Sequence, residues 1–170
     1  MINIITEASL SEFGQVALAN AYRIRRAWII SPWFTATKSR YDPLALIVEA
    51  LKRRGVHIDI VTRPPRECWH REAVDVLRAN LRPNIHYNAN LHSKLYILKC
   101  DGFQYAMLGS PNLTYRADTR NKEISVEFRT SMSENSDPVA SMIDELSRYA
   151  IALIAEESTR RESKEERKRC

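Results

Sequence analysis

Residues 2–81 alternate short apolar runs with longer amphipathic runs, and this alternation restricts the folds that the chain can adopt. The short runs have the length of strands, whereas the longer runs repeat apolar residues at helical spacing. Ser9 or Ser11 is the expected N-cap of the first helix, and Asp42 is that of the second. Strands in alternation with helices predict a sheet covered by helices. The expected strands are 3–6, 27–31 and 56–62, and the expected helices are 9–27, 42–55 and 66–81.

After residue 84 the pattern changes to strands that follow one another with short connections. These runs are 85–88, 92–99, 103–109 and 123–128. Short connections favour antiparallel pairing, so the sheet is expected to be mixed. A long helix over 137–158, with Asp137 as its expected N-cap, closes the pattern.

These patterns together predict an α/β fold, namely an α-β-α sandwich with a mixed, mainly central sheet. A chain of 170 residues with 44% hydrophobic residues can bury the core of one domain, which we place at residues 1–157. Residues 158–170 hold no apolar residue except the last cysteine. They are expected to form a charged tail or an extension of the last helix.

The charge of the chain favours an anionic partner. Lys and Arg exceed Asp and Glu, for a formal net charge of +5 and a pI near 9.2. The three cysteines are widely spaced and show neither a zinc nor a disulfide pattern, which suits a reducing compartment. No run is long and apolar enough to span a bilayer, and the N-terminus lacks the pattern of a signal peptide. We therefore expect a cytoplasmic protein with no membrane contact and no cofactor.

Polar residues at the ends of the apolar hairpin 92–109 form the candidate site. Polar groups at the ends of buried strands cost desolvation free energy unless they bind something. His92 and Lys94 begin the first strand and are expected to share a face, while Ser110 and Asn112 follow the second strand. Since the start of one antiparallel strand neighbours the end of the next, these four residues are expected to converge. One imidazole, one cation and two neutral hydrogen-bonding groups suit an oxyanion such as phosphate.

A carboxylate from the next expected strand completes this site. Asn121 and Glu123 are two residues apart at its start and are expected to share a face. A carboxylate near an imidazole fixes the tautomer of the ring and stabilises its protonated form. Glu123 is therefore the expected orienting group of His92. Each of these residues alone is more often structural, but the ordered set on adjoining strands favours a functional site.

The run HSKLYILKCDGFQYAMLGSPN, followed by NKE, resembles the signature of the phospholipase D superfamily. That signature is His-x-Lys, an Asp, Gly-Ser-x-Asn and a downstream acidic residue, and the resemblance is most specific over residues 91–128. It implies the α-β-α fold of that superfamily. The sequence departs at one position, because Lys99 stands where the family usually has its Asp, and Asp101 follows two places later. The resemblance implies catalytic roles for His92, Lys94, Ser110, Asn112 and Glu123.

The resemblance also implies a mechanism with two histidines. In this superfamily one His attacks phosphorus to give a phosphohistidine, and a second His protonates the leaving oxygen and later activates water. The motif occurs once here, since no other His has a Lys two residues on, so the second His92 would come from an identical subunit. We expect a homodimer with one composite site and a bell-shaped pH profile. Lys94 and Asn112 of both subunits would hold the phosphate oxygens without a metal.

Small, single-motif members of the superfamily resemble nucleases, so the leading prediction is an endonuclease that cleaves DNA or RNA. Two alternatives stay open. A phospholipid phosphodiesterase would need a lipid-binding helix that the sequence does not show, and a nucleic-acid-binding member without catalysis would not need the complete catalytic set. The expected substrate contacts are Ser31, Trp33, Tyr115, Arg116, Arg120 and Asn121.

Overall fold

A computed structural model describes residues 1–37, 42–131 and 137–163 of the chain. Its centre is one eight-stranded sheet with the order β1-β7-β6-β5-β2-β3-β4-β8. The strands are β1 Ile2–Ile5, β2 Ile24–Ile30, β3 His57–Thr62, β4 Asn84–Asn88, β5 Leu95–Cys100, β6 Phe103–Gly109, β7 Ser125–Thr130 and β8 Thr159–Arg161. The helices are α1 Ser9–Ala19, α2 Pro43–Leu51, α3 Cys68–Leu81, α4 Tyr115–Thr119 and α5 Pro138–Ala155.

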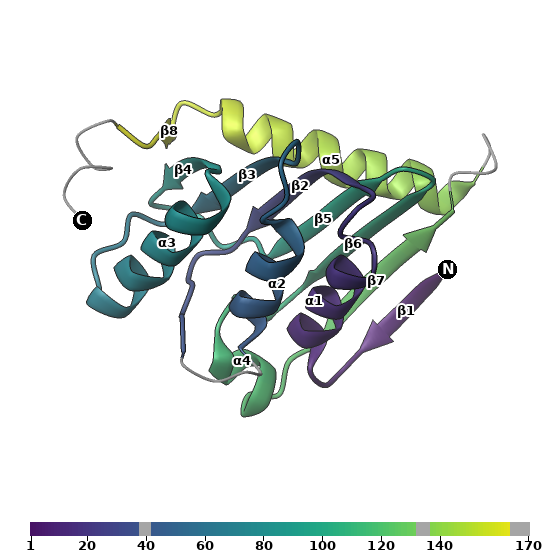
Figure 1. The fold of residues 1–170 in the computed structure, drawn as a ribbon, viewed down its shortest axis with the longest axis horizontal. Helices are drawn as coiled ribbons and strands as arrows, with labels where there is room; N and C mark the ends of the chain where they lie inside the picture. Colours follow the sequence, from purple (N-terminus) through teal and green to yellow (C-terminus); the bar gives the residue numbers. More distant parts are fainter. Residues whose placement is uncertain (38–41, 132–136, 164–170) are drawn as a thin grey trace.

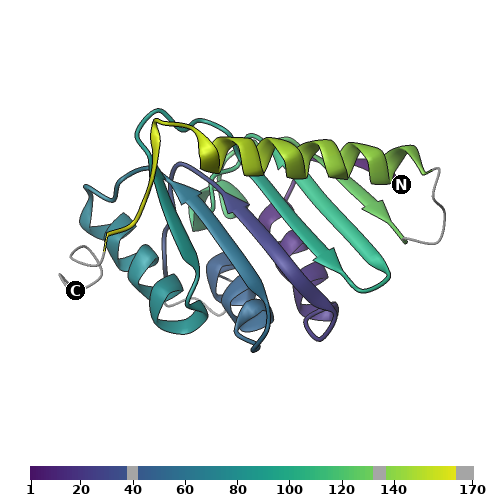
Figure 2. The ribbon, with the colours of Figure 1, turned by 90° about the horizontal axis from the view of Figure 1, so that it is seen from above.

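The sheet is mixed, as the change of pattern after residue 84 predicts. Strands β2, β3 and β4 pair in parallel, and every other pairing is antiparallel. Helices α1, α2 and α3 cover one face, and α5 runs along the other (Figures 1 and 2). The expected α-β-α sandwich is therefore confirmed. No helix in the described ranges is long and apolar enough to cross a bilayer.

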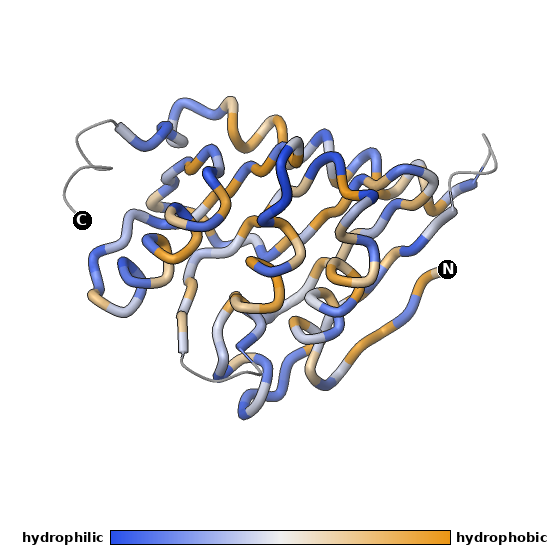
Figure 3. Tube along the Cα trace, viewed as in Figure 1, coloured by the Kyte–Doolittle hydropathy of each residue, from blue (hydrophilic) through white to orange (hydrophobic). Residues whose placement is uncertain are grey.

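Each strand of the central hairpin sends alternate side chains into two separate cores. On β5, Tyr96 and Leu98 join the core under α1, α2 and α3, whereas Leu95 and Ile97 join the core under α5. The central strands accordingly carry long apolar stretches (Figure 3). This burial on both faces fixes the register of β5 against β6, and with it the place where each strand ends.

The N-caps of the helices show which expected caps were correct. Asp42 and Asp137 cap α2 and α5 as expected, since each side chain accepts a hydrogen bond from the backbone two residues on. The expectation of Ser9 or Ser11 for α1 is wrong, because the N-cap is Ala8 in a left-handed conformation. The carboxylate of Asp118, on α4, instead accepts from the backbone N–H groups of residues 10 and 11.

Several element boundaries differ from the sequence-based expectation, and three of them affect the site or its basic residues. Helix α1 ends at Ala19, so Arg25 and Arg26 lie on β2 rather than at a helix end. The expected strands 92–99 and 123–128 begin later, at Leu95 and Ser125. Their first residues, which include the candidate site residues, lie in irregular chain just before the strands.

Residues 159–163 correct the expectation of a charged tail or a helical extension. Strand β8 pairs antiparallel with β4, and Glu162 is buried beyond it. The Glu162 carboxylate accepts a hydrogen bond from the Tyr87 hydroxyl at 2.7 Å and pairs with the Arg78 guanidinium. A buried carboxylate is stable there because both groups compensate its lost hydration. The rest of the expected tail, residues 164–170, lies outside the described residues.

Candidate active site

Three chain segments meet where neighbouring strands of the sheet end. They are residues 91–94 before β5, 110–114 after β6, and 121–124 before β7. The backbone joins them directly. The Gly109 N–H donates to the Lys94 carbonyl at 3.3 Å, and the Ser110 N–H donates to the Ile124 carbonyl at 3.0 Å. The site is therefore built on the ends of three neighbouring strands of the central sheet.

Gly109 allows this close approach. A Cβ atom at Gly109 would lie 2.5 Å from the Ile124 carbonyl oxygen and 2.8 Å from the Cα atom of Ser125. Both contacts are with backbone, which cannot move aside as a flexible side chain can. The absence of a side chain at Gly109 thus brings Ser110 against the segment that carries Glu123.

His92 and Lys94 lie side by side at the entrance of the site. The Lys94 Nζ atom is 3.3 Å from Nδ1 of His92, the His92 side chain is exposed, and Lys94 is half-buried. They share no strand face, because both precede β5 in irregular chain. An exposed imidazole beside a fixed ammonium group can meet an anion from solution.

Glu123 binds Ser110 and Asn121. The Ser110 hydroxyl donates to one carboxylate oxygen of Glu123, and the Asn121 amide donates to the other at 3.0 Å. The Ser110 oxygen also accepts from the Ile124 N–H at 3.1 Å. Within the three described ranges no hydrogen bond joins Glu123 to His92, so its expected orienting role stays a prediction.

Asn112 presents an unsatisfied amide at the same edge. Its Oδ1 atom is buried and has no hydrogen-bond partner in the described part of the chain. The neighbouring backbone is fixed, since the Tyr96 hydroxyl donates to the Pro111 carbonyl at 2.9 Å and burial raises the pKa of that phenol. A buried polar atom without a partner needs an explanation, and a ligand that donates to this oxygen would supply one.

Ser31 is buried and positions the loops around Asn112. Its hydroxyl donates to the Trp33 carbonyl and accepts from the Leu113 N–H, each at 3.0 Å. The expectation that Ser31 contacts substrate is not supported by this placement, because both hydrogen bonds are internal. Ser31 instead ties the chain after β2 to the chain after β6.

The expected contacts Tyr115, Arg116 and Arg120 lie on and after the short helix α4. Thr114 caps this helix through its side chain, and the Tyr115 N–H donates to Thr35 at 3.1 Å. Arg116 is exposed and lines a cavity that also contains Asn112. Arg120 lines a second, polar cavity with Asn121 and Glu123.

The sequence analysis missed Arg63, which borders the site. Its Nε atom donates to the Leu91 carbonyl at 2.9 Å, and its guanidinium lies 5.2 Å from the ring centre of Trp33. Arg63 directly follows β3, the parallel neighbour of β2. Ligands bind outside the carboxyl ends of parallel strands, so this position is the signal that could have identified it.

Lys99 and Asp101 lie at the other end of β5, away from His92. Lys99 pairs with Asp144 on α5 and donates to Gln104, while Asp101 pairs with Arg25. The residue that departs from the family signature is therefore a structural ion-pair partner. Across the described ranges, no group of three His, Cys, Asp or Glu side chains converges in a way that could hold a metal.

Comparisons with known proteins agree with this architecture. No curated protein sequence matches the chain. The solved structure of Nuc from Salmonella typhimurium, a phospholipase D family member, is 18% identical with a TM-score of 0.69, covering 95% of this chain and 97% of that one. NucT from Helicobacter pylori is 14% identical with a TM-score of 0.63, covering 91% and 96%. Yeast tyrosyl-DNA phosphodiesterase is 16% identical with a TM-score of 0.50, covering 92% of this chain and 39% of that one.

The match to a family model decides the assignment. The model of the cardiolipin synthase PLD-like domain matches residues 16–147, which include every candidate catalytic residue. The solved structures share the fold over nearly the whole chain. The chain therefore belongs to the phospholipase D superfamily.

Proposed function

We propose that the chain is a metal-independent phosphodiesterase, an endonuclease that cleaves DNA or RNA through a phosphohistidine in a homodimeric site. One observation carries this proposal: exposed His92 has the Lys94 ammonium 3.3 Å from its Nδ1 atom, on a strand end hydrogen-bonded to the end that carries Ser110 and Asn112. A nucleophile, a cation and neutral amide and hydroxyl groups are the parts that phosphoryl transfer requires.

In the proposed reaction His92 attacks phosphorus through Nε2, and the bond from phosphorus to the leaving oxygen breaks. The His92 of the second copy donates its proton to that oxygen, then removes a proton from the water that hydrolyses the phosphohistidine. Attack through Nε2 requires the ring proton on Nδ1, where Lys94 now donates. The incoming phosphate would draw the ammonium to its own oxygens and free Nδ1 to take up that proton.

An uncovered apolar patch beside the site supports the homodimer. The patch consists of Ile2, Ile4, Leu108 and Ile124, of which Ile4 is 69%, Ile124 55% and Leu108 40% exposed. Ile4 and Leu108 both pair with Val126, so they form one row on the α5 face of the sheet. A second copy that covers this row would also bring its own His92 to the same edge.

Nucleic acid is the substrate class that the charge and the relatives favour. The chain carries a formal net charge of +5, and the yeast relative is named for a phosphodiester of DNA. The family model is named for cardiolipin synthase, which keeps phospholipid as the second candidate substrate. In the described ranges no helix has the length and apolarity to cross a bilayer, although surface binding would not need one.

The test is a cleavage assay in excess EDTA on single- and double-stranded DNA and RNA, with phospholipid vesicles alongside. The wild-type chain is expected to cleave nucleic acid under chelation, and His92→Ala is expected to abolish cleavage. His57→Ala is the matched control, since His57 is exposed at the start of β3 and far from the site. Cleavage by His92→Ala at the wild-type rate, or activity that returns only with added magnesium, would contradict the proposal.

A further inference from the structure

A cavity of about 640 Å³ adjoins the catalytic candidates, of which Asn112 lines it. Two Trp residues and a Tyr are among its lining residues. Among the described residues, a cavity that contains Glu123 and one that contains Arg63 are smaller, at about 320 and 170 Å³. The residues that line the large cavity are Trp33, Thr35, Ala36, Thr37, Trp69, Asn112, Thr114, Tyr115 and Arg116.

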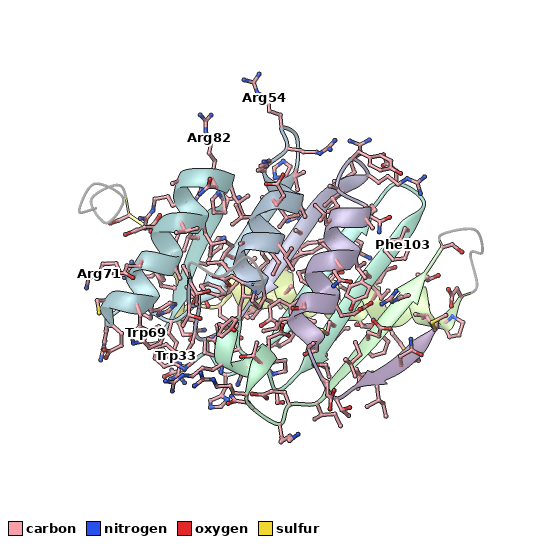
Figure 4. The ribbon with its side chains drawn as sticks, turned by 60° about the horizontal axis from the view of Figure 1, so that its bottom comes forward. Trp33, Arg54, Trp69, Arg71, Arg82 and Phe103 are labelled. Atoms are coloured by element: carbon pink, nitrogen blue, oxygen red, sulfur yellow. The ribbon has the colours of Figure 1, made fainter. Side chains whose placement is uncertain are left out.

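The aromatic rings of this cavity are held in place from below. The Trp33 and Trp69 ring centres lie 5.8 Å apart at 53°, and both side chains lie where α3 begins, with Trp69 in the first turn of that helix (Figure 4). Both rings contact the buried imidazole of His70, which stacks on Trp69 at 5.7 Å. Trp69 is still 39% exposed. Fixed, partly exposed rings offer a flat surface to a planar ligand at low entropic cost.

Two arginines, Arg63 and Arg116, lie beside these aromatic rings. Arg63 lies over the Trp33 ring and also donates to the Leu91 carbonyl, one residue before His92. Arg116, on α4, lines the cavity itself. These arginines therefore favour a ligand that stacks on the rings and carries negative charge beside its planar part. A nucleotide has this combination of a planar base and a neighbouring phosphate.

We propose that this cavity, between Trp33, Trp69 and Tyr115, binds an unpaired nucleobase next to the phosphate at His92. The chain is then selective for single-stranded nucleic acid, because a base inside a duplex is stacked and paired and cannot enter without being extruded. This inference rests on the proposed function for the position of the phosphate. It adds the substrate class and the residues that recognise it.

The composition of the wall favours a base over an acyl chain. Aliphatic chains are bound by aliphatic side chains, and the described residues that line this cavity include no Leu, Ile, Val or Met. Rings with cations beside them instead match a stacked base between phosphates. The lining hydroxyl groups of Thr35 and Thr114 accept backbone hydrogen bonds, at 3.1 and 3.2 Å, and each has a proton to donate to the edge of a base.

The test compares two strands that share one backbone. The full-length His92→Ala chain is titrated in EDTA with an oligothymidylate and with an abasic strand of equal length, and binding is followed by fluorescence anisotropy. The strand with bases is expected to bind about tenfold more tightly. Trp69→Ala, and separately Tyr115→Ala, in the His92→Ala chain are expected to remove this difference. The control is Tyr22→Ala, which removes an exposed Tyr at the opposite end of β2 and is expected to retain it.

Equal affinity of the His92→Ala chain for the two strands would overturn the inference before any further variant is tested. Retention of the base preference in both Trp69→Ala and Tyr115→Ala would also overturn it, as would displacement of the oligothymidylate by anionic phospholipid vesicles but not by a mononucleotide. Hydrolysis of bis(p-nitrophenyl) phosphate by the wild-type chain reports on the proposed function separately. If that activity is present but base preference is absent, the inference alone fails. If base preference is present but the wild-type chain hydrolyses no phosphodiester, the inference holds and the proposed function fails.

Discussion

The Lys94 ammonium and the His92 imidazole share one hydrogen bond, with Nζ 3.3 Å from Nδ1, in the chain just before β5. An ammonium group has three donors, so Lys94 can keep this position and still offer donors to an incoming oxyanion. The pair is therefore arranged to bind a phosphate before the reaction and to stabilise the charge that develops during it.

Lys94→Gln is expected to lower kcat/KM for phosphodiester cleavage about 100- to 1,000-fold, the usual cost of losing one such donor at a reacting group. Lys99→Gln is a matched control, because Lys99 pairs with Asp144 at the other end of the same strand. Its kcat/KM should stay within about twofold of wild type, because Lys99 lies away from the reacting groups. The fold should also persist, because a surface ion pair contributes about 1 kcal/mol or less to the free energy of unfolding. Equal losses in both variants would contradict the role given to Lys94.

The homodimeric site predicts a specific result when subunits are mixed. Equal amounts of wild-type and His92→Ala chains are unfolded together and refolded, so that about a quarter of the dimers contain two wild-type subunits. If the reaction needs two His92 side chains, the activity is expected to be about a quarter of that of wild type at the same total protein. Chains refolded separately and then combined should retain about half. Half the activity in both samples would show that each chain acts alone.

The patch beside the site predicts how the dimer can be broken. Ile4→Lys places a charge at the β1 end of the row that contains Leu108, and burying an unpaired charge at an interface costs several kcal/mol. We expect a monomer by light scattering and loss of cleavage together. Ile151→Lys is the matched control, because Ile151 is a half-exposed isoleucine on α5 outside the patch. A dimeric, active Ile4→Lys chain would place the interface elsewhere.

The sequence predicted those features that depend on neighbouring residues. Asp42 and Asp137 act within their own first turn, and β5 is visible as a continuous apolar run because Tyr96 and Ile97 enter different cores. The cap of α1 was missed because Asp118 stands more than a hundred residues from the backbone that it caps.

Other features depend on long-range contacts in the same way. Strand β8 has only three residues, all polar, so it carries no periodic signal, and its place depends on Glu162 reaching Tyr87. Within the candidate site the sequence predicted which strand ends adjoin. It did not predict the side-chain partners, since Glu123 binds Ser110 and Asn121.

His70 provides a prediction about stability and pH. Its side chain is fully buried, its Nε2 atom lies 3.1 Å from the Thr62 hydroxyl, and burial lowers its pKa to about 4. In the unfolded chain a His titrates near 6.5, so between about pH 6.5 and pH 4 the unfolded state binds more protons than the folded state. The free energy of unfolding should therefore be fully retained above about pH 6.5 and fall by about 3 kcal/mol as the pH drops to about 4.

A difference between two variants isolates this contribution from the carboxylates, which also titrate in acid. His70→Leu removes the titrating group from the core, so its unfolding free energy, measured by urea denaturation, should change less between pH 7 and pH 4.5 than that of wild type. His57→Gln is the matched control, because it removes an exposed imidazole at the start of β3, outside the core, and its profile should follow wild type. If His70→Leu and wild type lose the same stability over this range, the imidazole is not held neutral by its burial under Trp33 and Trp69.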